Sequence, residues 1–264
     1  MVTMTVVFAL ITVLGLAVGS FVNVVIHRVP LGLSLITPPS RCAGCGHRIS
    51  WRHNVPVVSW LMLRGRCARC SARISIRYPS VELLTAVLFL AVSVRLADIG
   101  MLAAVPAYLY FTAVALALGA IDIRQHRLPA GIVNPSYVVL AVLLVFSAVA
   151  AREWSALARA AAGAAVLFAV YLAIMLVFRN GMGFGDVRFS GVLGAILGYL
   201  SWSALVVGAF AGFLFGAVVG VVCVAAGRDR RAPLPFGPFM IAGAFAGIFA
   251  GDAIATAYLA FVGA

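Results

Sequence analysis

Acidic residues and lysine are the scarcest features of this 264-residue sequence. Only seven Asp and Glu residues occur, and all 19 basic residues are Arg, because the sequence contains no Lys. Charged residues make up 10% of the chain and hydrophobic residues 64%, whereas a soluble globular domain carries roughly 25% charged residues. The composition therefore excludes an ordinary soluble domain and predicts an integral membrane protein.

The missing residue types also exclude several classes of hydrolase. Without Lys, a serine–lysine protease is impossible, and the sequence has neither the H-E-x-x-H pattern of zinc metalloproteases nor the G-x-S-x-G elbow of α/β-hydrolases. The four histidines fall in polar stretches or at the ends of apolar runs, which favours surface positions over a catalytic base: His27, His47, His53 and His126. If the chain is a protease, its few carboxylates are the remaining catalytic groups.

Apolar runs set the predicted architecture, because a helix needs about 20 residues to cross a bilayer. The first run lacks a basic n-region and a small-residue cleavage site, so we expect it to be retained as a span. No internal repeat is apparent. We predict an all-α polytopic membrane protein with about eight transmembrane helices. The runs cover residues 5–26, 81–97, 102–121, 132–150, 156–178, 189–200, 203–226 and 236–260, and the run 189–200 is the shortest.

Arginine predicts the orientation of these spans. Nine Arg fall in residues 28–77, two follow residue 121, two flank residues 180–187 and three fall in residues 228–231, while the alternate loops and adjoining span ends hold three. Basic residues concentrate in cytoplasmic loops, so these four segments are predicted to be cytoplasmic, with both termini on the other side. The same bias explains the net charge of +12, and with no groove-reading motif present we expect no nucleic-acid partner.

Four of the five cysteines form a pattern typical of a metal site. Cys42 and Cys45 are separated from Cys67 and Cys70 by 21 residues, and two C-x2-C pairs at such a spacing indicate a tetrahedral zinc site. Disulfides are the alternative, but they are rare in the cytoplasm. Four protein ligands leave no open position, so the zinc would be structural. Cys223 lies in an apolar run and is expected to be a packing residue.

The predicted zinc site lies in a polar insert with little core of its own, for which a metal would supply folding energy. We therefore divide the chain into a first transmembrane helix (1–27), a small cytoplasmic four-cysteine zinc domain inserted between the first and second helices (28–79), and a membrane-embedded domain (80–264).

The seven carboxylates can be examined one by one. Asp98 and Glu153 fall in outer loops and Asp229 among arginines, so these are predicted to be solvated. Asp252 lies within the last span, where a carboxylate is a functional candidate, but the favoured interpretation is a polar anchor near the outer interface. Glu82 begins the second span. Asp122 and Asp186 each lie where an apolar run meets a cytoplasmic loop, on the same predicted side and at similar depth.

Two carboxylates that meet at a membrane–water boundary suit aspartic proteolysis. One ionised carboxylate takes a proton from water while its protonated partner donates to the scissile carbonyl. Like charges held close cannot both ionise, which keeps one proton on the pair. Asp186 ends a glycine-rich segment in which Gly183, Phe184 and Gly185 are predicted to form an active-site loop. The alternative is that Asp186 only caps the following helix.

With these motifs in order, the chain resembles the bacterial type IV prepilin peptidases, which are GxGD-type aspartic proteases. The pattern is seen as Gly183-Phe184-Gly185-Asp186, and the second family aspartate corresponds to Asp122 in DIRQHRLP. Further matching segments are GSFVNVVIHRVP from residue 19, PVVSWL from residue 56, RGRC from residue 64, RYPSVE from residue 77 and PFGPF from residue 235.

The resemblance implies a substrate and a second activity. The substrate is a prepilin or pseudopilin precursor, cut between a short basic leader and an apolar helix at the cytoplasmic face of the bacterial inner membrane. Members with the four cysteines commonly N-methylate the new N-terminus with S-adenosylmethionine, a cofactor that rests here on resemblance alone. Asn23 and Glu82 are candidate substrate or cofactor contacts, with interface polarity and helix capping as alternatives.

A different class of function is a polytopic transporter or channel with a zinc-stapled cytoplasmic domain. Such a protein is expected to carry carboxylates near the bilayer midplane at broken helices. Asp122 and Asp186 lie at span ends instead, which favours the enzyme.

Overall fold

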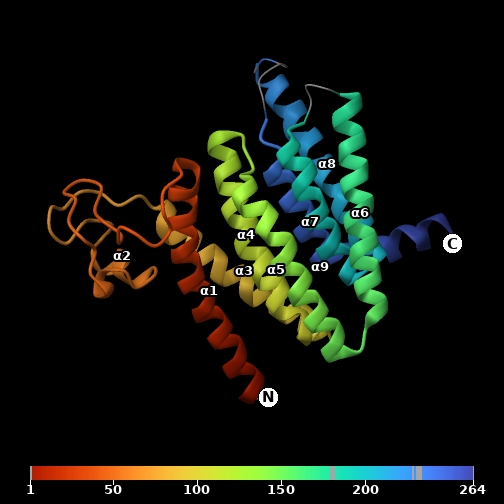
Figure 1. Ribbon diagram of the computed structural model, residues 1–264, viewed down its shortest axis with the longest axis horizontal. Coiled ribbons are helices and arrows are strands. Elements are labelled where there is room, and N and C mark those ends of the chain that lie inside the picture. The colour runs from red at the N-terminus through yellow and green to blue at the C-terminus, as the bar shows by residue number, and fades with distance from the viewer. Residues whose placement is uncertain (1, 179–181, 228, 230–233, 264) are drawn as a thin grey trace. The chain divides into compact units, whose positions relative to one another are not determined.

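The computed structural model describes residues 2–178, 182–227, 229 and 234–263, and this part of the chain is almost entirely helical (Figure 1). No β-strand occurs among these residues; two isolated bridges lie in the cysteine-rich segment. The α-helices are α1 (Val2–Arg28), α2 (Val58–Met62), α3 (Arg77–Asp98), α4 (Val105–Gln125), α5 (Ala130–Ala151), α6 (Trp154–Val177), α7 (Phe184–Leu200), α8 (Trp202–Ala225) and α9 (Gly237–Val262).

The described residues contain seven helices that are long and apolar enough to cross a membrane, which confirms a multi-pass membrane protein. The cysteine-rich segment lies between α1 and α3, as predicted for an insert between the first two spans. The short run 189–200 belongs to α7, whose 17 residues span about 25 Å, less than the length of each of the seven candidate spans. The candidate spans are Met4–Leu31, Arg77–Asp98, Leu102–Gln125, Ala130–Ala151, Trp154–Val177, Trp202–Ala225 and Gly237–Val262.

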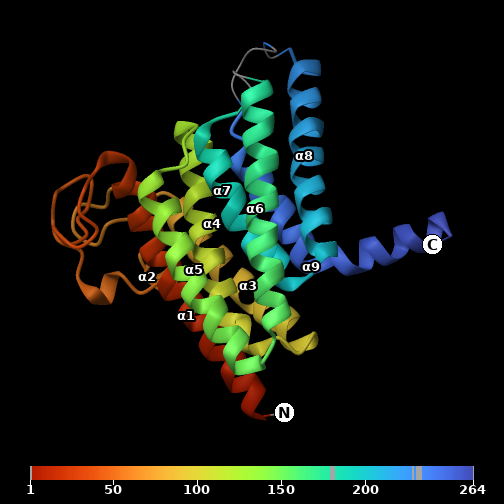
Figure 2. The ribbon, with the colours of Figure 1, turned by 45° about the vertical axis from the view of Figure 1, so that its right-hand side comes forward.

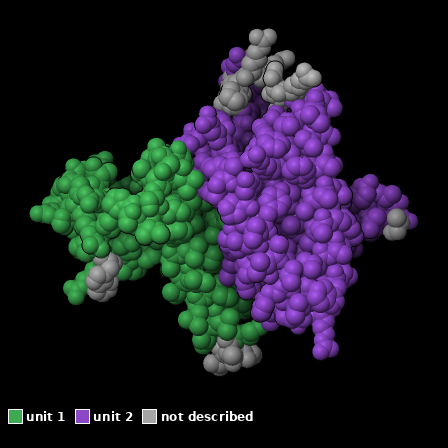
Figure 3. Space-filling view, in the orientation of Figure 1, with its two compact units in different colours: residues 1–98, 112–117 green, residues 99–111, 118–264 purple. Residues whose placement is uncertain are grey.

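The chain divides into two compact units, coloured separately in Figure 3. Unit 1 comprises residues 1–98 and 112–117, and unit 2 comprises residues 99–111 and 118–264. Unit 1 therefore holds α1, the cysteine-rich segment and α3. Unit 2 holds α5 to α9 and both ends of α4, including Asp122 and Asp186.

Within unit 1, α1 packs directly on α3 through two glycines. A Cβ added at Gly15 would lie 2.6 Å from the Cα of Ala86, and one added at Gly19 would lie 2.6 Å from the Cα of Glu82. Small residues allow such close approach, and van der Waals packing of this kind holds helices together in lipid.

Within unit 2, glycines likewise bring helices into contact in pairs. Gly163 of α6 faces Gly194 of α7, where a Cβ at position 163 would lie 2.5 Å from the Gly194 carbonyl oxygen. Gly243 of α9 faces Gly208 and Gly212 of α8 in the same way. The ribbon views show α6 beside α7 and α8 beside α9 (Figure 2).

Helix α7 is the buried centre of unit 2, with most of its residues from Val187 to Leu200 inaccessible. Hydroxyl groups from its neighbours bind its carbonyls: Tyr137 donates to Arg188 and Tyr108 donates to Ile196. At the end of α7, the guanidinium of Arg159 donates to the carbonyls of Gly198, Tyr199 and Leu200. Carbonyls at a helix end need partners wherever water is excluded, so Arg159 lets this short helix end inside the protein.

The glycine contacts lead to a first prediction. Gly243→Ala should lower the thermal unfolding temperature of the detergent-solubilised protein, because its methyl group would overlap the backbone of Gly208 and Gly212, and overpacking of this kind costs about 1–3 kcal/mol. Gly220→Ala on α8 is the matched control, since a Cβ there meets nothing within 4 Å. Equal unfolding temperatures for the two variants would contradict close packing of α8 on α9.

Candidate functional site

Asp186 lies in the first turn of α7, three residues after the N-cap Gly183. Its Oδ2 accepts the N–H of Gly183 at 3.1 Å, while its own N–H donates to the carbonyl of Gly183 at 3.0 Å. Asp186 therefore takes part in the capping of α7 from the third helical position, whereas the alternative made it the N-cap residue itself. Capping engages Oδ2 and is compatible with a further role, because a carboxylate has several acceptor positions.

Phe184 and Gly185 are helical, which corrects the prediction that they form a loop with Gly183. The helix starts earlier than expected because Gly183 has extended backbone and Asp186 satisfies its N–H. Gly185 is needed for close packing, since a Cβ there would lie 3.1 Å from the Cβ of Leu128. The first glycine of the segment, Gly181, lies outside the described residues.

Asp122 lies in the last turn of α4 and is 4% exposed. Its Oδ2 accepts the N–H of Gly237, the first residue of α9, at 2.9 Å. A Cβ at Gly237 would come within 2.8 Å of this oxygen, so a larger residue at position 237 would displace the Asp122 carboxylate. The chain then turns at His126, whose left-handed backbone ends α4.

The two aspartates act on each other electrostatically. Asp186 precedes the apolar part of α7 and lies outside the seven candidate spans. Burial, and after it the negative charge of Asp122, raise the pKa of the Asp186 carboxyl to about 6, against a lowering effect of the Gly183 N–H. Leu128, in the connection between α4 and α5, packs against both Gly185 and Gly237. The structure thus brings together the predicted pair at the meeting point of α4, α7 and α9.

The sequence alone gave no role to the late segment PFGPF, which supplies two parts of this site. Gly237 donates the hydrogen bond to Asp122. Phe236 packs in an aromatic cluster, with its ring centroid 6.3 Å from that of Tyr171 and 5.4 Å from that of Phe213. The available signal was Gly237 itself, which lies between Phe236 and Pro238, because a glycine lets another group approach the backbone closely.

The four predicted cysteine ligands cluster in unit 1. The Sγ atoms of Cys42, Cys45, Cys67 and Cys70 lie within 4.8 Å of one another, and those of Cys42 and Cys70 are 3.8 Å apart without a disulfide bond. Tetrahedral Zn–S bonds of about 2.3 Å imply a sulfur–sulfur distance of about 3.8 Å. The N–H groups of Cys70 and Arg69 lower the pKa of the Cys67 thiol to about 6, which favours the thiolate that binds metals.

An internal repeat underlies the cluster, which corrects the expectation that none exists. Residues 41–50 and 66–75 share the pattern R-C-A-x-C-x-x-R-I-S. Each copy is closed by an antiparallel bridge, Arg41 with Arg48 and Arg66 with Arg73. Each also turns at a residue with positive φ, Gly46 in the first copy and Ser71 in the second. Two equivalent knuckles, each contributing two thiols, give a donor set that fits one tetrahedral metal ion.

Asn23 and Glu82 lie at the junction between α1 and α3. The Nδ2 of Asn23 donates to the carbonyl of Tyr78 at 3.0 Å. Glu82 is 8% exposed, and its Oε2 accepts the N–H of Val57 at 2.7 Å. Both predicted contact residues are therefore engaged with other parts of unit 1.

The remaining carboxylates have other surroundings. Asp98 and Glu153 are exposed. Asp252 accepts a hydrogen bond at 2.8 Å from the Oγ of Ser201, which also caps the start of α8. This contact lies at the opposite end of α7 from Asp186, so Asp252 is separate from the aspartate pair.

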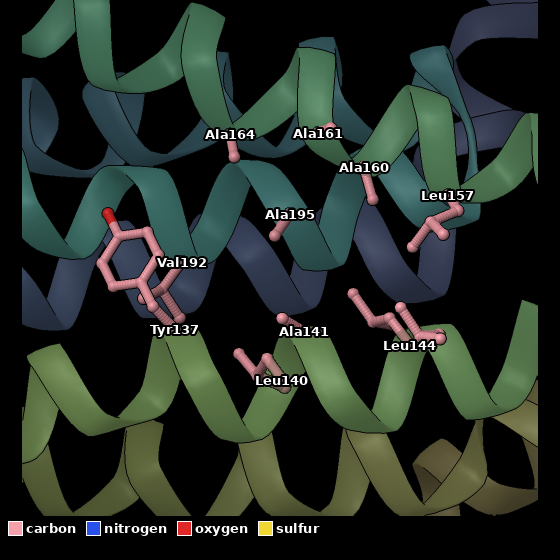
Figure 4. Close-up of a pocket in the computed structure, with 11 residues that line it drawn as sticks. Tyr137, Leu140, Ala141, Leu144, Leu157, Ala160, Ala161, Ala164, Val192 and Ala195 are labelled. Carbon is pink, nitrogen blue, oxygen red and sulfur yellow. The ribbon is translucent and has the colours of Figure 1, made fainter.

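A cavity of about 210 Å³ opens between α5, α6 and α7 (Figure 4), and neither aspartate of the pair lines it. Its lining is almost wholly apolar and includes Tyr137, Leu144, Ala164 and Val192. Val192 follows Asp186 by six residues, which places it roughly 120° around the helix from the carboxylate. The cavity therefore contains no carboxylate and is separate from the aspartate pair.

Comparisons with known proteins agree over nearly the whole chain. Residues 13–96 match the bacterial peptidase A24 N-terminal domain, and residues 109–221 match the type IV leader peptidase family. The prepilin leader peptidase/N-methyltransferase of Aeromonas hydrophila is 36% identical over 281 residues, covering 96% of this chain and 93% of that protein. The protein of the same name from Stutzerimonas stutzeri is 35% identical over 94% and 92% of the two chains. No solved structure matches the chain.

These matches define a family of membrane-embedded leader peptidases. The chain belongs to the type IV leader peptidase family. The resemblance seen in the sequence is confirmed, and the alternative of a transporter or channel finds no support among the relatives.

The cysteine cluster leads to a second prediction. Cys45→Ser should abolish stoichiometric metal binding, because three thiolates and a hydroxyl make a poor tetrahedral site, and elemental analysis of the purified protein measures this directly. Cys223→Ser, which removes the one cysteine outside the cluster, should bind as much metal as the native protein. A folded, reduced native protein without bound metal would reject the site.

Proposed function

We propose that the chain is a membrane aspartic endopeptidase that removes the leader from prepilin or pseudopilin precursors, with Asp122 and Asp186 as the catalytic pair. The observation that carries this proposal is the placement of the two carboxylates at the ends of α4 and α7, where Leu128 packs against both Gly185 and Gly237, in a chain related to prepilin leader peptidases over 90% or more of its length. The glycine segment of residues 183–185 would form the first turn beneath the substrate.

The geometry supports a division of labour between the carboxylates. The monoprotonated pair has one carboxylate that takes a proton from water and one carboxylic acid that donates to the scissile carbonyl. Backbone N–H groups from Gly183 and Gly237 each hold one oxygen of a carboxylate. Each aspartate keeps its second oxygen for water or substrate.

We also propose that the site faces the cytoplasm of a bacterial inner membrane. Helix order supports a common side for the cysteine-rich segment, the end of α4, the start of α7 and the start of α9, and these carry the Arg-rich segments. Of those arginines, Arg179, Arg228, Arg230 and Arg231 lie outside the described residues. The basic leader of a precursor would thus remain on the cytoplasmic side while its apolar helix lies in the bilayer.

The second proposed activity is N-methylation of the new N-terminus with S-adenosylmethionine. It is supported by the names of the relatives. We propose that the metal held by the two knuckles is a structural zinc ion, since its four thiol ligands leave no open position. As a functional division we retain 1–27 as the first span, 28–79 as the zinc domain and 80–264 as the protease domain.

Substitution of either aspartate tests the catalytic assignment. Asp186→Asn and Asp122→Asn should each lower leader cleavage by roughly 10⁴-fold or more, because the titrating group is lost while its size is kept. The double variant should be little worse than either single variant, since members of one catalytic unit are non-additive. Cleavage of a purified prepilin by protein in detergent is the measurement.

Two further carboxylates serve as controls for this experiment. Asp229→Asn should cleave normally, because it lies in a loop among arginines. Asp252→Asn should retain activity, because its partner is Ser201. If Asp252→Asn were inactive and Asp186→Asn near normal, the site would have to be moved to α9.

The pKa of Asp186 gives the protease a pH signature. A carboxyl group with a pKa raised to about 6 holds its proton below that pH and loses it above. The rate of leader cleavage should therefore fall as pH rises, with a midpoint within about one unit of 6. The rate should also be low in strong acid, because both carboxylates are then protonated. A rate that continues to increase up to pH 9 would contradict a shared catalytic proton.

A further inference from the structure

Val57 has an unusual backbone conformation for a β-branched residue. Its φ is 59° and its ψ is −50°, outside the regions that such residues normally occupy. The N–H of Val58 donates to the carbonyl of Pro56 at 2.6 Å. Pro56, Val57 and Val58 thus form a γ-turn of the rare positive-φ type, which is strained. Such strain persists only where surrounding contacts hold it.

The contact that holds this turn is the carboxylate of Glu82. Its Oε2 accepts the N–H of Val57 at 2.7 Å, and Ser20 of α1 also hydrogen-bonds to the side chain. Hydrogen bonds to a charged group are stronger than neutral ones. A buried carboxylate is costly unless it is bonded in this way, so the turn and the carboxylate stabilise each other.

Glu82 itself is held rigidly by the pairing of α1 with α3. The backbone of Gly19 lies so close that a Cβ there would be 2.6 Å from the Cα of Glu82. One turn before Glu82, the carbonyl of Tyr78 accepts a hydrogen bond from Asn23 of α1. The close packing of α1 on α3 therefore fixes the position of the Glu82 carboxylate at one end of this helix pair.

On its other side, the turn leads through Trp60 to the second cysteine knuckle. Helix α2 begins at Val58, directly after the turn. The Nε1 of Trp60 donates to the carbonyl of Ile74 at 3.1 Å, and its ring packs on Gly65, where a Cβ would lie 2.9 Å from it. Gly65 and Ile74 flank the knuckle that carries Cys67 and Cys70, and the N–H of Ile74 donates to the carbonyl of Gly65 at 2.7 Å.

We propose that Glu82 is a positioning residue that fixes the second cysteine knuckle to the α1–α3 pair by holding Val57 in its strained turn. This role replaces the direct substrate or cofactor contact that the sequence suggested for Glu82. Loss of the carboxylate releases the turn, because the Val57 backbone then relaxes to an ordinary conformation. The expected effect of this loss on methyl transfer rests on the proposed function. The expected effect on the position of the second cysteine knuckle does not.

Hydrogen exchange of the intact protein in detergent tests the structural part. In Glu82→Ala, amides of residues 57–74 should exchange about ten-fold faster or more, because a hydrogen bond to a charged group is lost. Glu82→Gln should retain most of the protection, since its amide oxygen still accepts the Val57 N–H. Asp98→Ala, an exposed carboxylate at the other end of α3, should leave the exchange unchanged.

A second substitution separates positioning from a general packing role. Glycine adopts positive φ readily, so Val57→Gly in the Glu82→Ala background should recover protection by about two- to five-fold. If protection from exchange were lost only because Glu82→Ala leaves an empty space, a substitution at Val57 would not restore it. If Glu82→Ala does not accumulate, Glu82→Asp, which withdraws the carboxylate by one methylene, replaces it with the same expectation.

The two activities give an independent readout. Methyl transfer should fall in Glu82→Ala and return in part in the double variant, while leader cleavage continues, because Asp122 and Asp186 belong to unit 2. A native protein without methyl transfer would refute the second proposed activity and leave the exchange experiment to decide the positioning role. That role is overturned if Glu82→Ala exchanges like the native protein, or if Val57→Gly recovers none of the lost protection.

Discussion

The hydrogen bond between a carboxylate and the N–H at a helix start organises the aspartate site. In a membrane, a carboxylate and the free N–H groups of a helix end both need partners where water is scarce. Asp122 accepts the N–H of Gly237 at the start of α9, and Asp186 accepts that of Gly183 at the start of α7. Helix starts favour negative charge, so each contact stabilises both an anion and a helix end.

This arrangement requires backbones to approach closely, which explains where glycine is needed. Leu128 packs between Gly185 and Gly237, and at either position a Cβ would come within about 3 Å of it. At Gly183 a Cβ would lie 3.4 Å from the Asp186 oxygen, an ordinary contact, so packing demands glycine more strictly at 185 than at 183. Close packing of the same kind joins the middle and the end of α7 to α6, where Gly194 and Gly198 meet the backbone of α6.

The aspartate pair and the cysteine cluster could be predicted from the sequence because both residue types are scarce in this chain. Seven carboxylates in 264 residues made Asp122 and Asp186 visible by position alone, and the cysteine spacing predicted a cluster that the structure places within 4.8 Å. The start of α7 was misplaced because glycines were given loop conformations, whereas the Asp186 carboxylate stabilises a helix start there.

Other features depend on contacts between distant segments, which spacing does not reveal. Gly237 meets Asp122 across 115 positions and Val57 meets Glu82 across 25. The repeat of residues 41–50 in residues 66–75 is present in the sequence, but the cysteine spacing alone does not reveal it, because it also depends on the arginines, isoleucines and serines around the cysteines. Its physical meaning, two knuckles closed by equivalent bridges, is evident only in the structure.

The central claim is that Asp122 and Asp186 form one electrostatic unit, and infrared spectroscopy tests it most directly. The carbonyl stretch of a protonated carboxyl group, assigned to Asp186 by its loss in Asp186→Asn, reports the protonation of this residue as pH is varied. The account predicts a midpoint near 6 in the native protein and a lower midpoint in Asp122→Asn, because the neighbouring negative charge is gone. An Asp186 midpoint that is the same with and without the Asp122 carboxylate would contradict it.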